Sequence, residues 1–103
     1  MGVTENQIDG RQHIALEGEL DLATAPVLEQ ALARALESRA DIVVDLSGCS
    51  FIDARGIRVL ANSARSLEAE QRKLRVTGLN GQPERIFAMT LSYLRPIEVQ
   101  AAT

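Results

Sequence analysis

Side chains that could do chemistry gather in two polar segments, and the second segment places hydroxyls close to a carboxylate. Ser47 and Ser50 precede Asp53 there, a combination that would serve nucleophilic catalysis if a histidine base stood nearby. His13 is the only histidine, and it falls in an expected strand far from both serines in the sequence. We therefore interpret the serines as loop and turn residues and His13 as an ordinary strand residue.

Metal or redox chemistry would depend on Cys49, the only cysteine of the chain. A zinc site needs about four ligands at characteristic spacings, and one cysteine with one histidine does not supply them. Cys49 could be a redox sensor, but a small, partly buried side chain ahead of a helix is the simpler interpretation. The chain also lacks the glycine-rich motifs that bind phosphates and the Gly-x-Ser-x-Gly nucleophile motif. The sequence therefore does not predict an enzyme.

Composition narrows the classes of partner. The net charge is −3, only 3% of residues are aromatic and tryptophan is absent, which disfavours nucleic acids and anionic membrane surfaces as partners. No segment reaches the length of roughly 18 apolar residues that a transmembrane helix needs, and residues 1–7 do not resemble a signal peptide. A lone cysteine cannot form an internal disulfide and fits a reducing compartment. We expect a cytoplasmic protein that binds no nucleic acid and does not insert directly into a membrane.

The elements that must position the polar segments begin with a hairpin and a helix. Residues 3–9 and 12–17 are typical of short strands, and Asp9-Gly10 between them is a common hairpin turn. Thr24 is a good N-cap residue, and Pro26 fits the first turn of a helix. The helix that they begin carries one apolar stripe, made of Val27, Leu28, Ala31, Leu32, Ala35 and Leu36.

A central strand and a second helix follow. Residues 42–46 form a β-branched run that predicts a strand covered on both faces. We expect a loop over residues 47–52, leading to Asp53 as the N-cap of the second helix. The inner face of that helix is marked by apolar residues at helical spacing, namely Ile57, Leu60, Ala61, Ala64 and Leu67.

The last third of the chain completes the sheet. Alternation over residues 73–77 predicts a strand, and Pro83 opens a short helix. Residues 94–99 predict a final strand, which Pro96 restricts to an edge or a bulge. Strands alternating with helices imply parallel pairing with right-handed crossovers. We therefore expect an α/β fold in which helices pack against a mixed, mostly parallel sheet, formed by residues 1–103 as one domain.

Three ordered motifs resemble the STAS domain of bacterial anti-sigma factor antagonists. Residues 18–26 read GELDLATAP, where the family has approximately G-E-[LI]-D-x-x-[TN]-A. Residues 44–60 read VDLSGCSFIDARGIRVL, similar to V-[DN]-[LM]-x-x-[VL]-x-[FY]-[ILM]-D-[ST]-[ST]-G-[LI]-x-x-L. Residues 85–90 read RIFAMT, similar to R-[IL]-F-x-[ILM]-[TS]. The resemblance covers residues from about 12 to 95, and the predicted element order is also that of the STAS fold.

The resemblance implies partner switching. In the family, the unphosphorylated antagonist binds an anti-sigma factor with a serine-kinase fold of the GHKL type, and a sigma factor is released. The kinase can phosphorylate the antagonist on the hydroxyl that follows the aspartate of the second motif. Ala54 occupies that position here, with Arg55 after it, and neither accepts phosphate from such a kinase. We expect an antagonist that is not phosphorylated at the usual site and needs no cofactor.

The resemblance also indicates which residues bind the partner. For Asp53, helix capping and partner contact are compatible, whereas Asp21 is either a solvated loop carboxylate or part of the interface. Arg55 is either a solvated arginine or a contact to an acidic patch on a partner, which Arg58 would extend. Gly56 either permits close approach of another backbone or relaxes the helix start. The expected partner-binding set is Asp21, Thr24, Ser50, Asp53, Ala54, Arg55, Gly56 and Arg58.

Departures from the family pattern keep other functions open. Leu91 stands where the family has a glycine, and the usual C-terminal helix is expected to be short or absent, which would expose apolar surface and favour a homodimer. The main alternative is an accessory STAS subunit of a lipid-transport ABC complex at the inner membrane. A sensor of a nucleotide or another small ligand is a weaker alternative, since no phosphate-binding loop is present.

Overall fold

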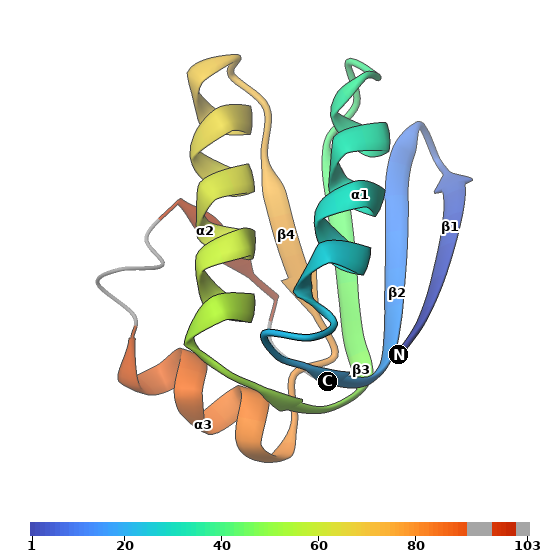
Figure 1. Cartoon of the computed structure of the whole chain (residues 1–103). Coiled ribbons are helices and arrows are strands. Elements are labelled where there is room, and N and C mark those ends of the chain that lie inside the picture. The colour runs from blue at the N-terminus through green and yellow to red at the C-terminus, as the bar shows by residue number, and fades with distance from the viewer. Residues whose placement is uncertain (91–95, 101–103) are drawn as a thin grey trace.

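A β-hairpin opens the fold. The computed structural model describes residues 1–90 and 96–100, and it begins with β1 (Gly2–Ile8) paired antiparallel to β2 (Arg11–Leu20) (Figure 1). Asp9 and Gly10 both have positive φ, at 51° and 76°. Two such residues form the turn whose twist matches that of the flanking strands. The predicted hairpin and its Asp-Gly turn are therefore confirmed.

The remaining strands extend the sheet in parallel. β3 (Ile42–Ile52) pairs with β2, β4 (Leu74–Thr77) with β3, and β5 (Ile97–Val99) with β4. The order across the sheet is therefore β1-β2-β3-β4-β5, identical to the order along the chain. The expected mixed, mostly parallel sheet with its hairpin at one side is confirmed.

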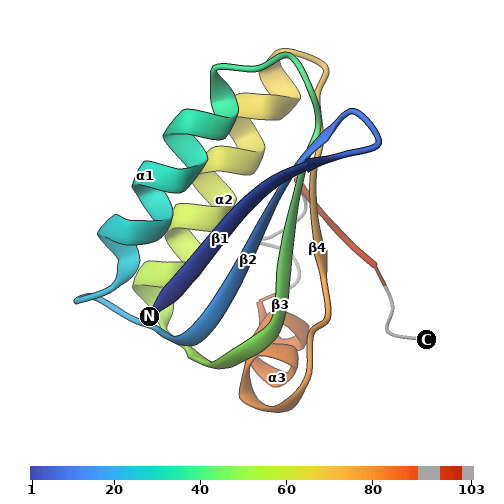
Figure 2. The same cartoon turned by 90° about the vertical axis from the view of Figure 1, so that its right-hand side faces the viewer.

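Two long helices cover one face of the sheet. α1 (Ala25–Leu36) carries Pro26 in its first turn, and α2 (Ala54–Ala69) starts directly after Asp53. Both lie side by side on the same face, while the shorter α3 (Gly81–Met89) packs near the end of the sheet where β3 runs into α2 (Figure 2). This is the arrangement expected when successive right-handed crossovers move in one direction across a sheet.

The core lies between the sheet and the inner faces of α1 and α2. Alternate residues of β2 meet the apolar stripes that the sequence predicts on the two helices. Val27 is the exception, because this predicted member of the α1 stripe is 40% exposed. Fully burying one Leu or Ile side chain stabilises a fold by about 1.5–3 kcal/mol, so this layer carries most of the favourable free energy. Its largest fully buried side chains are Ile14, Leu16, Leu20, Leu28, Leu32, Ile42, Leu46, Ile52, Leu60, Leu67 and Leu74.

Some predicted element boundaries are wrong. The expected loop over residues 47–52 is part of β3, which continues to Ile52 with Cys49 and Ile52 buried and the residues between them exposed. β2 likewise continues to Leu20, and its register with β3 shifts twice on the way. Polar and glycine residues at these positions suggest a loop from the sequence. The register shifts allow such residues to remain within a strand.

The end of the chain agrees with its predictions as far as it is described. β5 begins directly after Pro96 and is an edge strand, as the proline requires. Residues 94 and 95 of the predicted strand lie outside the described residues. The expectation of a short or absent C-terminal helix likewise falls outside them.

Candidate functional site

The two polar segments of the sequence meet at one end of the sheet, where β2 leads into α1 and β3 leads into α2. The backbone N–H of Asp53 donates to the carbonyl of Leu20 at 3.1 Å. In return, the Asp53 carboxylate accepts a 3.2 Å hydrogen bond from the backbone N–H of Leu22 through Oδ2. A main-chain bond to Leu20 and a side-chain bond from Leu22 therefore tie Asp53 to the segment before α1.

Asp53 is also the N-cap of α2. Its Oδ1 accepts the backbone N–H groups of Arg55 at 2.9 Å and Gly56 at 3.1 Å, as predicted for a capping residue. Because the first N–H groups of a helix have no partner within it, this carboxylate satisfies two of them. One side chain thus fixes both the start of α2 and the neighbouring loop.

Asp21 and Thr24 form a second, local network. Asp21 Oδ1 accepts the backbone N–H groups of Ala23 at 3.0 Å and Thr24 at 3.1 Å. The Thr24 hydroxyl donates to the carbonyl of Glu19 at 2.8 Å and accepts the N–H of Asp21 at 2.9 Å. Thr24 occupies the N-cap of α1 but makes no side-chain capping bond, because its hydroxyl turns back into the loop. Asp21 is therefore a half-buried structural carboxylate of this turn.

A further residue of the site, Gln82 of α3, was not predicted. Its side-chain amide donates to the carbonyl of Ile52 and accepts the Ile52 N–H, both at 2.9 Å. This pair of bonds satisfies the backbone of the last residue of β3 and fixes the position of the residue before Asp53. No signal in the sequence identifies it, since a glutamine in a first helical turn is ordinary and its partner lies 30 positions away.

The exposed surface around this framework combines small, apolar and cationic groups. Ser50 and Ala54 are exposed, and so is the side chain of Leu22, at 69%. Ala54 borders a cavity of about 270 Å³ between α2 and α3, which Ile86 also lines. Arg58 is exposed at the edge of the same cavity. Ala54 is thus exposed beside this cavity and contributes only a methyl group.

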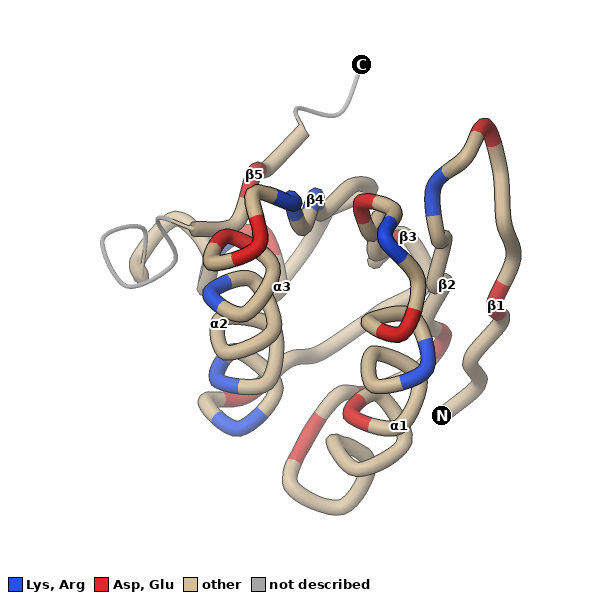
Figure 3. Tube along the Cα trace, turned by 90° about the horizontal axis from the view of Figure 1, so that it is seen from above, with Lys and Arg blue, Asp and Glu red and all other residues tan. Residues whose placement is uncertain are grey.

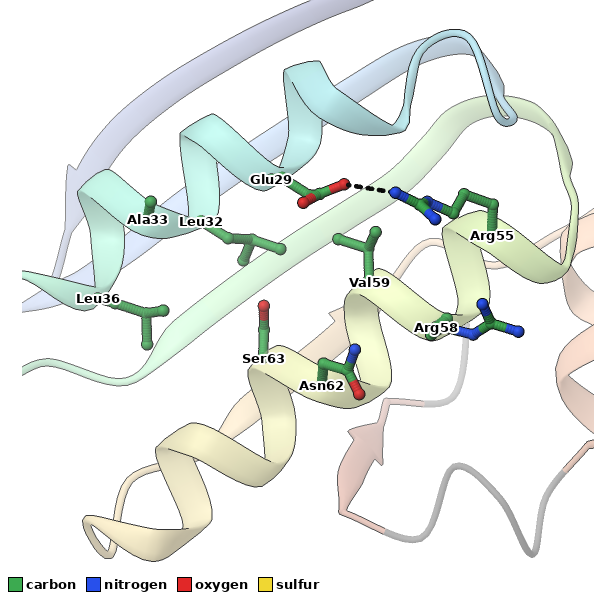
Figure 4. A pocket seen from close by; sticks show the side chains of 9 residues that line it. All are labelled: Glu29, Leu32, Ala33, Leu36, Arg55, Arg58, Val59, Asn62 and Ser63. Atoms are coloured by element: carbon green, nitrogen blue, oxygen red, sulfur yellow. Dashed lines mark ion pairs between the residues drawn. The ribbon is translucent and has the colours of Figure 1, made fainter.

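Arg55 and Gly56 have different roles in the first turn of α2. Arg55 reaches across to α1, where its Nη2 lies 3.7 Å from Glu29 Oε1 in a solvent-exposed ion pair (Figure 4). Gly56 is buried, and a Cβ there would lie 2.7 Å from Leu20 Cγ and 2.9 Å from Ile52 Cγ1. The close approach that Gly56 permits is therefore to two core side chains of the same chain.

Cys49, the side chain that could support redox chemistry, is buried close to this framework. Cys49 is 2% exposed, its thiol donates to the carbonyl of Phe51, and burial raises its pKa above the ordinary value. A raised pKa disfavours the reactive thiolate, which supports the small-filler interpretation over the redox sensor. Within residues 1–90 and 96–100, no group of three or more His, Cys, Asp or Glu side chains is placed to hold a metal, and no helix is long and apolar enough to cross a membrane.

Comparisons with known proteins agree on one family. A family model described as "Mlab, STAS domain" matches residues 3–90. The chain is 30% identical over 88 residues to the anti-sigma-B factor antagonist of Bacillus subtilis, covering 85% of this chain and 79% of that protein. It superimposes with a TM-score of 0.80 and 28% identity on an anti-sigma factor antagonist from Mycobacterium paratuberculosis, covering 94% and 84% of the two chains. The anti-sigma factor antagonist SpoIIAA in its unphosphorylated form has the same fold, with a TM-score of 0.75, 18% identity and coverage of 99% and 90%.

Proposed function

The chain belongs to the STAS domain family, and from this premise we propose that it is an anti-sigma factor antagonist. The named relatives support a protein that regulates by binding and not by catalysis. We propose a cytoplasmic location and a single STAS domain, with a protein as its partner. The net charge of −3 is consistent with a partner other than a nucleic acid.

The proposed partner is an anti-sigma factor with a serine-kinase fold, and its binding to this chain releases a sigma factor. The observation that carries this proposal is the Asp53 framework, which holds both polar segments in one rigid surface before any partner arrives. A surface ordered in advance loses little conformational entropy on binding. Ser50, Ala54 and Arg58 are exposed on it, while Asp21 and Thr24 fix the loop beside it.

The switch itself is proposed to be absent at the usual position. Ala54 has no hydroxyl, and Arg55 next to it is engaged with Glu29. An antagonist without the acceptor cannot be turned off by phosphorylation there, so its activity would follow its abundance. A phosphate at this helix start would add a charge of about −1.5 to −2 in the middle of the surface, which Ala54 never acquires.

The test is a pull-down from the cells of origin with Mg·ADP present and identification of the captured proteins by mass spectrometry. Recovery of a kinase-fold anti-sigma factor is the expected result. Ala54→Glu should lose it because a carboxylate would enter the proposed interface, whereas Ala69→Glu, an exposed alanine at the other end of α2, should keep it. Absence of such a kinase, or equal capture by both variants, would contradict the proposal.

A second candidate function is the accessory subunit of a lipid-transport ABC complex at the inner membrane. The observation that favours it is the description of the matching family model as "Mlab, STAS domain". The same pull-down separates the two functions, because this one predicts co-purification with an ATPase subunit and a permease in place of the anti-sigma factor.

We also propose that the protein can form a homodimer. Leu22 and Met89 are large apolar side chains that are 69% and 81% exposed and are available for contact with a second copy of the chain. Light scattering of the purified chain over a range of concentrations tests this, since a mass that stays at that of one chain at every concentration would exclude the homodimer.

A further inference from the structure

A groove of about 280 Å³ runs between α1 and α2, on the side of the helices that faces away from the sheet (Figure 4). Its floor is apolar, since Leu32 and Leu36 of α1 face Val59 of α2 along it. Its edge toward the start of α2 is charged, with Arg55, Arg58 and Glu29 around it. An apolar floor beside charged groups is the layout of a site for an amphipathic segment of another protein.

The charge of α2 is unlike that of the chain as a whole. The helix carries three arginines and no acidic residue between Ala54 and Leu67, whereas the whole chain has a net charge of −3 (Figure 3). Two of these arginines, Arg55 and Arg58, line the groove at positions about one helical turn apart. The guanidinium group of Arg55 points toward Glu29, whereas that of Arg58 points away from it, toward solvent (Figure 4). This local excess of positive charge is complementary to carboxylates on a partner.

Glu29 is the internal competitor for these arginines. Its distance to Arg55 is 3.7 Å, and the two side chains are 47% and 45% exposed, so the ion pair is long and well hydrated. Pairs of this kind contribute little, and a carboxylate from a partner can replace Glu29 at small cost. Among the described residues, Arg58 has no ion pair at all.

We infer that this groove receives an acidic, amphipathic segment of the anti-sigma factor. An apolar side chain of the segment packs on Ala33 and Leu36, the more exposed apolar side chains of the groove, and a neighbouring carboxylate binds Arg55 in place of Glu29, with Arg58 beside it. The inference rests on the proposed function and adds to it the chemistry that the partner must present. It also explains why an arginine follows Ala54 in this chain, since Arg55 turns the first turn of α2 into a receptor for carboxylate.

The experiment measures the dissociation constant of the purified anti-sigma factor recovered in the pull-down. Arg58→Gln should weaken binding about tenfold and Arg55→Gln several-fold, both with a shallower dependence on salt. Arg11→Gln removes the same charge from the exposed start of β2, away from the groove, and should stay within about twofold of the natural chain. All three side chains are exposed, so we expect each variant to fold like the natural chain.

Glu29→Gln separates partner recognition from a structural role of the ion pair. If Glu29 competes with the partner, its removal should strengthen binding about two- to fivefold. If the pair only holds the helices together, Glu29→Gln should weaken binding in the same direction as Arg55→Gln, and this outcome would overturn the inference. If the natural chain binds the anti-sigma factor and both arginine variants bind it with the same dissociation constant, the inference is overturned but the proposed function is not. Failure of the natural chain to bind the anti-sigma factor would overturn the proposed function together with it.

Discussion

The side-chain amide of Gln82 and the backbone of Ile52 exchange two hydrogen bonds of 2.9 Å each. Through this contact α3 determines where β3 ends and where the N-cap of α2 begins. The Asp53 carboxylate, one residue further on, ties the same point to the loop before α1. The proposed interface therefore depends on three elements that are distant in sequence, and its presentation should be sensitive to residues that a partner never touches.

Gln82→Ala should lower the free energy of unfolding by about 1–2 kcal/mol, because both polar groups of Ile52 lose their partner. Gln82→Glu should lower the free energy of unfolding by at least as much. Its carboxylate can still accept the Ile52 N–H, but it has no N–H to donate to the Ile52 carbonyl. Urea denaturation followed by circular dichroism measures both changes. Arg85→Ala, at an exposed position of the same helix, is the matched control and should change little. Equal stabilities of the Gln82 and Arg85 variants would contradict the assigned contact.

Gly56→Ala should destabilise the protein by about 1–3 kcal/mol, although alanine in an exposed helix interior normally stabilises by up to about 1 kcal/mol. The sign is reversed because the added methyl would lie 2.7 Å from Leu20 Cγ and 2.9 Å from Ile52 Cγ1. Thermal and urea unfolding give the magnitude. Ser66→Ala, at an exposed position of the same helix, should be neutral or stabilising. A stabilised Gly56→Ala variant would show that α2 does not pack this closely.

Ala54→Ser should convert the protein into a substrate of its proposed kinase partner. The new hydroxyl would stand at the exposed start of α2, next to Asp53. With ATP and the purified anti-sigma factor, intact-mass spectrometry should detect one added phosphate on the variant and none on the natural chain. The phosphorylated variant should then bind the anti-sigma factor more weakly. Stoichiometric phosphate on the natural chain would disprove the proposed loss of the switch.

Cys49 should react with a thiol reagent only as fast as the protein opens. The thiol is 2% exposed and burial raises its pKa, so little thiolate is available near neutral pH. The reaction with Ellman's reagent, followed by absorbance, should be slow in buffer and complete within minutes in denaturant. Rapid reaction of the folded protein would revive the redox-sensor interpretation.

The ion pair of Glu5 and Arg34 should make stability depend on pH in a defined window. The Arg34 side chain donates to both Glu5 carboxylate oxygens, and these hydrogen bonds join β1 to α1. They also lower the pKa of Glu5. A lowered pKa means that the contribution is present above the ordinary glutamate value, roughly 4.3, and is lost as the pH falls through the folded-state value. The difference in unfolding free energy between the natural chain and Glu5→Gln should therefore vanish in acid. A difference that is constant with pH would contradict this prediction. As a control, the variant that carries both Glu5→Gln and Arg34→Gln should have the same unfolding free energy as either single variant.

The elements that the sequence predicts well are those whose signals are local. The Asp9-Gly10 hairpin turn and the N-cap at Asp53 follow from the conformations and hydrogen bonds that these residue types favour. The buried stripes of α1 and α2 follow from their helical period. Each of these features involves residues within a few positions of each other, which is the range over which pattern reasoning holds.

The features that the sequence does not predict depend on partners far along the chain. Arg55 meets Glu29, and Gln82 meets Ile52, only after the sheet has brought their elements together. The length of β3 has the same cause, because its polar end remains a strand by pairing with β2 across two register shifts. The sequence indicates which residues belong to the candidate site but not which of them are committed to holding its framework.

The identity of strand order and chain order has a consequence for how the molecule is made. Each parallel strand pairs with the strand synthesised just before it, so the sheet can grow from one edge as the chain leaves the ribosome, with every new strand meeting a finished neighbour. Among the described strands, the same one-way winding leaves no point at which the order across the sheet reverses direction. Such points are where open α/β sheets form crevices for nucleotides and other small molecules. The proposed protein partner would therefore meet an outer surface of this sheet and not a crevice between its strands.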